Sequence, residues 1–142
     1  MTDETAMRAE GVTGGIRDAV SIRLPAEGAY LSVLRTATAG LAARLDFTLD
    51  QIEDLRIAVD EACAMLLRQA VPGTELMAEF ELTGEEMTIR VEVSTVGTTE
   101  PRRDDFAWMV LTALADDVDA VTGAPDRMAI VLRKRKSMAG PA

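Results

Sequence analysis

Alternating apolar and polar residues mark four segments of the chain as strands. Residues 19–24 (AVSIRL), 75–82 (ELMAEFEL), 87–94 (MTIRVEVS) and 127–135 (RMAIVLRKR) follow a two-residue period over most of their length, as half-buried strands do. Residues 83–86 (TGEE) join the second and third segments and predict a hairpin turn. These strands predict a sheet with an apolar face that other elements must cover.

Three further segments repeat apolar residues at three- and four-residue spacing, which predicts helices. The first covers residues 29–45. The second is capped by Thr48, with Gln51 placed for a capping box, and runs to about Ala70 before Pro72 and Gly73. The third covers residues 106–121. Its predicted apolar face comprises Phe106, Met109, Val110, Ala113, Leu114 and Val118.

The element order is therefore βααββαβ, which predicts an α+β fold. We expect a two-layer sandwich, an open and mostly antiparallel sheet covered on one face by three helices. A length of 142 residues suits one domain, which we place at residues 18–136. Residues 1–17 are predicted to be a flexible lead-in and residues 137–142 a frayed tail.

Composition narrows the chemistry. The net charge is −9, so phosphate-driven binding of nucleic acid is not expected. One cysteine, Cys63, and no histidine exclude an ordinary zinc site and a Ser-His triad. We expect Cys63 to be a buried free thiol. No apolar run is long enough to span a bilayer, and we predict a cytoplasmic protein with no metal site.

Two carboxylates interrupt the apolar pattern of the second helix. Asp60 and Glu61 lie beside the stripe of Ile52, Leu55 and Val59. One interpretation is a solvated helix flank, and the other is a carboxylate that lines a groove as a base or ligand. The pattern leaves both open.

Three other features of the sequence concern residues whose place in the fold the pattern does not settle. Phe106 and Trp108 open the third helix and belong either to the core or to an exposed partner surface. Asp116 and Asp117 fall near its predicted C-terminal end, where acids oppose the helix dipole. The basic run 133–136 is expected to be a solvated strand end.

The long second helix with "LRIAVDEACAM" and the later "LADDV" resemble the RsbW-type anti-sigma factors of the GHKL (Bergerat-fold) ATPase and kinase superfamily. The resemblance covers about residues 19–135 and is greatest for the actinobacterial branch. It implies a protein that sequesters an alternative sigma factor and releases it to a STAS-domain antagonist. Many members also phosphorylate that antagonist on serine, and a homodimer is expected.

By this resemblance Glu61 holds the position of the kinase base. The family's Mg²⁺-ligating Asn falls four residues later, where this chain has Met65. Mg²⁺ prefers hard oxygen ligands, so a thioether does not replace that Asn.

The family's adenine-binding Asp and its following glycines align with Thr95, Gly97 and Thr99. Its phosphate-binding glycines align with Asp105 and Ala107, which adds a carboxylate where an anion would sit at a helix N-terminus. We therefore expect no nucleotide cofactor and lost kinase activity. An active kinase using ATP and Mg²⁺ at a diverged site stays as the alternative.

The family's sigma-contacting Arg aligns with Arg35 in the first helix. The expected partners are an alternative sigma factor and a STAS-domain antagonist, without nucleic acid or membrane. A regulatory module for a non-sigma partner is the remaining alternative.

Overall fold

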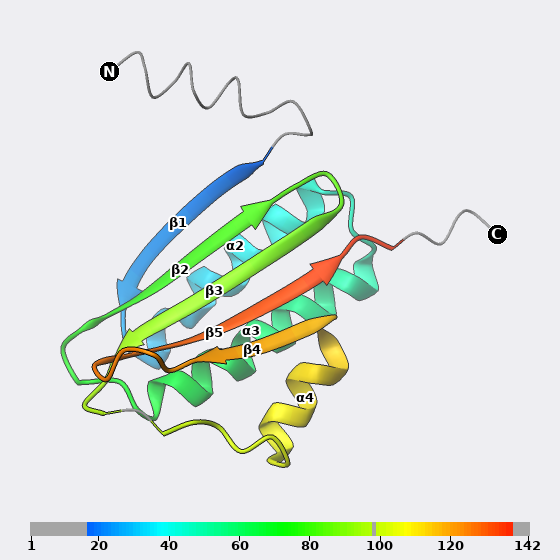
Figure 1. The fold of residues 1–142 in the computed structure, drawn as a ribbon. Coiled ribbons are helices and arrows are strands. Elements are labelled where there is room, and N and C mark those ends of the chain that lie inside the picture. Colours follow the sequence, from blue (N-terminus) through cyan, green and yellow to red (C-terminus); the bar gives the residue numbers. More distant parts are fainter. Residues whose placement is uncertain (1–16, 98, 138–142) are drawn as a thin grey trace, which may run out of the picture.

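A computed structural model of the chain describes residues 17–97 and 99–137. A five-stranded antiparallel sheet forms one layer and the helices form the other, all on one face of the sheet (Figure 1). The predicted α+β sandwich is thereby confirmed. The strands lie in the order β1-β2-β3-β5-β4. The predicted flexible lead-in at 1–17 and the predicted tail at 137–142 lie outside the described residues, except for Arg17 and Ser137.

The element bounds follow the sequence pattern closely except in one region. They are β1 (Asp18–Pro25), a 3₁₀ turn η1 (Gly28–Tyr30), α2 (Leu31–Arg44), α3 (Leu49–Leu67), β2 (Glu75–Leu82), β3 (Glu86–Ser94), α4 (Phe106–Leu114), β4 (Asp117–Val121) and β5 (Arg127–Arg135).

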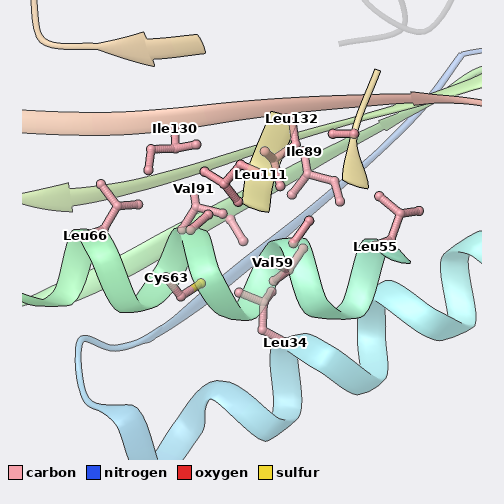
Figure 2. Close-up of a cluster of buried hydrophobic side chains, with 14 of the residues drawn as sticks. Leu34, Leu55, Val59, Cys63, Leu66, Ile89, Val91, Leu111, Ile130 and Leu132 are labelled. Carbon is pink, nitrogen blue, oxygen red and sulfur yellow. The ribbon is translucent and has the colours of Figure 1, made fainter. Parts of the chain in front are cut away.

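The core lies between the inner face of the sheet and the helices. Strands β2 and β3 alternate buried and accessible residues along most of their length, and β5 buries Met128, Ala129 and Ile130 in succession. Figure 2 shows Ile89, Val91, Ile130 and Leu132 of the sheet facing Val59 and other residues of α3. Cys63 is buried in this cluster as a free thiol, as predicted.

Local signals set both ends of the connection between α2 and α3. Asp46 adopts a φ of 61°, a left-handed conformation that Asp tolerates better than most residues. The amide of Phe47 then donates to the carbonyl of Ala42, as in a Schellman cap. Thr48 and Gln51 form the predicted capping box at the start of α3. The sequence therefore fixes where one helix ends and the next begins.

The prediction of a third helix over residues 106–121 is wrong for the second half of that range. Helix α4 ends at Leu114, and residues 117–121 form strand β4, antiparallel to β5. The true order therefore has a fifth strand before the last one. Residues 117–121 (DVDAV) alternate polar and apolar side chains, a strand pattern that the helical interpretation overrode. Asp117 pairs with Arg133 and Arg135 across the sheet instead of opposing a helix dipole.

The predicted apolar face of this helix is wrong in part, because Leu114 and Val118 do pack against the core, whereas Phe106 and Met109 do not. The core receives Ala107, Trp108 and Leu111. Phe106 is 77% exposed and Met109 is 56% exposed. Of the two places proposed for these aromatic residues, Trp108 lies in the core and Phe106 lies on the surface.

The basic run after β5 is only partly a solvated strand end. Lys134 keeps just 12% of its side chain exposed and faces the helices. Its Nζ donates to the carbonyl of Leu114, the last residue of α4, at 2.8 Å, and lies 3.6 Å from the carboxylate of Asp54 in α3. Lys134 therefore ties the end of α4 to α3 and β5.

Candidate functional site

Arg35 projects from α2 toward α3, where Asp60 meets it. The Nε atom of Arg35 lies 3.0 Å from Oδ1 of Asp60. No described atom forms a hydrogen bond with this Nε, so the contact is electrostatic. Both side chains are about 40% exposed, a setting in which an ion pair stabilises by about 0.2–1 kcal/mol. The pair therefore does more to orient the guanidinium than to stabilise the fold.

Glu61 is half-buried on the flank of α3 that turns away from the sheet. No ion pair or hydrogen bond joins its carboxylate to another described residue. It is therefore a carboxylate free to accept a proton or a partner. No hydrogen bond or ion pair joins it to the described residues of the 95–105 loop, which were predicted to share its site.

Met65 lies in the hydrophobic core cluster and is only 7% exposed. The same cluster contains Ala107 and Trp108 of α4. Mg²⁺ keeps several waters and takes oxygen ligands, which an apolar environment does not supply. No group of three or more acidic, Cys or His side chains within residues 17–97 and 99–137 is placed to hold a metal ion.

The segment after β3 returns across the end of α3. Thr95 is 4% exposed and forms an isolated β-bridge with Ala70. Its amide donates to the carbonyl of Asp126 at 2.9 Å, and its hydroxyl has no hydrogen-bond partner among the described residues. Gly97 adopts a φ of 74°, which favours glycine, so this bend is built into the sequence.

A pocket of about 430 Å³ lies at this crossing, lined by Gln69, Ala70, Val71, Pro72, Val96, Gly97 and Thr99. The Gln69 carboxamide spans it. Its Nε2 donates to the carbonyl of Thr99 at 3.1 Å, and its Oε1 accepts from the amide of Thr99 at 3.1 Å. The side chain thus pairs with the backbone of the loop as a neighbouring strand would.

The N-terminus of α4 is occupied by the chain's own residues. Asp105 is the N-cap residue and is exposed, although its side chain makes no capping hydrogen bond. Its carboxylate lies where the positive end of the helix dipole favours an anion. Ala107 is 8% exposed and packs inward. The two predicted phosphate positions therefore hold a fixed negative charge and a core methyl group.

The arrangement of these residues can be set beside known proteins. A protein named anti-sigma-F factor RsbW from Mycobacterium tuberculosis is 34% identical over 109 residues, which cover 77% of this chain and 64% of that protein. The chain is an RsbW homologue. A serine-protein kinase RsbW from Listeria monocytogenes is 36% identical over 88 residues, 59% of this chain and 54% of that protein.

The Bacillus subtilis serine-protein kinase RsbW is 40% identical over 53 residues, 37% of this chain and 33% of that protein. The chain thus spans less than two thirds of the length of these curated relatives. No protein-family model matches it.

The fold agrees with a crystal structure of the RsbU and RsbW domains of a Mycobacterium tuberculosis protein. The TM-score is 0.65 at 17% identity, and the match covers 87% of this chain and 34% of that chain. The relatives' names divide between anti-sigma factor and kinase, so homology alone does not decide which activity this chain has.

The sequence pattern does not indicate the roles of two residues in the site. Asp60 was noted only as one of two misplaced acids, and its pairing with Arg35 depends on how α2 packs on α3. The Gln69 contact with Thr99 depends on where the loop after β3 crosses the end of α3. A polar carboxamide at the end of an apolar helix, just before a Pro-Gly turn, was the available signal.

Proposed function

We propose that this chain is an anti-sigma factor. It sequesters an alternative sigma factor through α2, gives it up to a STAS-domain antagonist, and acts without a bound nucleotide. The observation that carries the proposal is the Arg35–Asp60 pair, a half-exposed guanidinium oriented at the position where the family resemblance expects the sigma contact. An arginine held in place loses less conformational entropy on binding.

Four positions support the part of the proposal that concerns nucleotide. Met65 and Ala107 are buried in the apolar core, and Asp105 adds a negative charge at the start of α4. Gln69 uses both polar atoms of its carboxamide to fasten the loop beside the pocket. A nucleotide at this position would have to displace these contacts.

A kinase using a diverged site is the second candidate, and one observation favours it. The carboxylate of Glu61 has no ion-pair or hydrogen-bond partner among the described residues, so its oxygens are available to accept the proton of a substrate hydroxyl. A regulatory module for a non-sigma partner is the third candidate.

The test is capture of each alternative sigma factor of the native cell by the immobilised chain. Arg35→Glu should weaken capture by about tenfold or more, since arginines often dominate interface energetics. Asp60→Asn should weaken it less, because Arg35 keeps its charge but loses its orienting partner. Arg23→Glu is the matched control, an arginine that is 63% exposed on β1.

Circular dichroism would first show that each variant is folded. Normal capture by a folded Arg35→Glu variant would place the sigma contact elsewhere. If no sigma factor is captured while a pull-down from native cells recovers another protein, the third candidate replaces the proposal.

A further inference from the structure

The two edges of the sheet differ in how they are protected against pairing with a further strand. Strand β4 at one edge is five residues long and carries Asp117 and Asp119, which pair with Arg133 and Arg103. Short and charged edge strands resist further pairing. Strand β1 at the other edge is eight residues long, and no described strand lies on its outer side. Its central residues 19–22 (AVSI) are uncharged, so the β1 edge is open to another strand.

Helix α2 presents apolar side chains on the same side of the molecule. It is the helix on the β1 side, with α3 between it and α4 (Figure 1). Arg35 turns toward α3 and Leu34 is fully buried, so Val33, a further 100° or so around the helix, lies on the flank away from α3. Tyr30 and Val33 are 43% and 48% exposed. Ala37 continues this flank at helical spacing.

Gly40 follows at the same spacing and completes what we call the outer flank of α2 (Tyr30, Val33, Ala37 and Gly40). It adopts ordinary helical backbone, and a Cβ added there would meet no atom within 4 Å. A glycine inside a helix costs about 0.5–1 kcal/mol relative to alanine. No contact in the described chain requires this glycine. Glycine suits positions where another backbone approaches closely, which points to a second chain at the outer flank.

Charge favours this side of the molecule for the association of two copies. The whole chain carries a net charge of −9. Residues 17–45, which include β1 and α2, contain four arginines and two acids, a net charge of 4 − 2 = +2. The rest of the chain therefore carries −9 − 2 = −11. Two copies repel each other least where the β1 and α2 sides meet.

We propose that the β1 edge and the outer flank of α2 bind a second copy of this chain, so that two five-stranded sheets continue into one. Residues directly opposite each other in antiparallel strands lie on the same face of the sheet, so the two-fold axis must pass through a residue. An axis through Ser21 brings the half-buried apolar residues on each side of it opposite one another. An axis one residue earlier would oppose Arg17 and Arg23, and one residue later would draw Pro25 into the ladder without a donor.

The strand and the helix place their contacts at the same level along the sheet. Ser21 lies four residues before the end of β1, about 13 Å. Gly40 lies nine residues after the start of α2, about 13.5 Å. Helix α2 runs back along the sheet in the direction opposite to β1 (Figure 1). Gly40 therefore lies near the proposed axis, where the two α2 helices would approach each other most closely.

The inference does not rest on the proposed function. Arg35 lies on the other flank of α2 and faces α3. A monomeric chain that still captures sigma would overturn this inference alone. A dimer that captures no sigma factor would overturn the proposed function alone.

Disulfide cross-linking of the full chain tests the register. The native thiol of Cys63 is buried, so Ser21→Cys supplies an accessible one. Opposite residues of antiparallel strands have Cα atoms about 4.5–5.5 Å apart, which a disulfide can bridge. Ser21→Cys should therefore form a covalent dimer on mild oxidation. Arg23→Cys is the matched control on the same face of β1 and should not, because Ala19 lies opposite it.

Sedimentation over a range of concentrations measures the dimer itself. Gly40→Glu should raise its dissociation constant at least about tenfold, because it sets two like charges against each other at the axis. Gly84→Glu is the matched control in the β2–β3 turn, where an added Cβ also meets no atom within 4 Å. Circular dichroism would first show that each variant is folded.

A dimer that Gly40→Glu leaves unchanged, or equal cross-linking of Ser21→Cys and Arg23→Cys, would overturn the proposal. A chain that is monomeric at every concentration would also overturn it. The strand that covers β1 would then have to come from residues 1–16 of the same chain or from another protein.

Discussion

At the scale of single residues, the two acids in the middle of α3 have different environments. Asp60 orients Arg35 from the neighbouring helix. Glu61, one position on, has no such partner among the described residues. Adjacent positions on a helix point about 100° apart, so only one of the two can face α2. The sequence placed both beside the apolar stripe, but the packing of α2 separated their roles.

The buried thiol of Cys63 makes a prediction about pH. Burial, and secondly the carboxylate of Asp60, raises the pKa of Cys63 from 9.0 to about 12. The folded chain then holds this proton to higher pH than the unfolded chain does. The stabilising effect is complete below pH 9 and is lost as the pH rises toward 12, with a limiting slope of about 1.4 kcal/mol per pH unit.

Urea unfolding of the wild type and of Cys63→Ala, compared between about pH 8 and pH 10, measures this effect. The free energy of unfolding should fall more steeply with pH in the wild type. Cys63→Ala serves as the control, because other groups that titrate at high pH are common to both chains. Parallel pH curves would contradict the pKa shift.

At the scale of elements, two glutamines fasten the two ends of α3. Near its start, the Gln51 carboxamide completes the capping box and donates to the carbonyl of Arg135 at the end of β5. Beyond its end, the Gln69 carboxamide pairs with the backbone of Thr99. The capping box is a local pattern and was predicted from sequence. The Gln69 contact joins residues 30 apart, so the local pattern can mark the glutamine but not its partner.

We predict that Gln69→Ala loosens the loop beside the pocket without unfolding the chain. Two hydrogen bonds are lost, each with a net contribution of about 1 kcal/mol, so the amide of Thr99 should exchange at least about tenfold faster. Hydrogen exchange followed by NMR measures this directly. Gln51→Ala is the matched control and should affect the amide of Ser137, which donates to Gln51, and leave Thr99 unchanged. Unchanged exchange at Thr99 would show that other contacts hold the loop.

Helix α4 shows how an element's pattern can mislead. Every position but Thr112 is apolar, so periodicity alone offers several faces for burial. The sequence favoured the stripe of Phe106 and Met109, whereas packing against α3 buries Ala107, Trp108 and Leu111. Lys134 decides where the helix ends by binding its last carbonyl from β5.

At the scale of the whole molecule, the two faces of the sheet differ in charge. The inner face is apolar apart from Lys134, and the outer face carries ion pairs that link neighbouring strands, such as Arg127 with Glu92 and Arg133 with Glu86. No helix in the described part of the chain is long and apolar enough to cross a membrane. The cytoplasmic location stays a prediction.

Nucleotide binding depends on residues from several elements at once, and we predict that the chain does not bind nucleotide. Titration calorimetry with Mg·ATP should show no binding to the unmodified chain, because the apolar core at Met65 offers no metal ligand and Asp105 repels phosphate. The variant Met65→Asn/Thr95→Asp/Asp105→Gly, which restores three family residues, is the positive control where it folds. A micromolar Kd for the unmodified chain would instead favour the kinase.

The sequence by itself determined the layer architecture, the bounds of β2 and β5, the cap of α3 and the burial of Cys63. These depend on short-range periodicity and on the identity of one or two neighbouring residues. Tertiary structure alone decided that residues 117–121 pair with β5, that Asp60 orients Arg35, that Gln69 fastens Thr99, and that α4 leaves Phe106 outside. The Asp60 and Gln69 contacts join segments distant in the chain, which local patterns do not encode, whereas β4 pairs with the next strand along the chain and its strand pattern competed with a helical one.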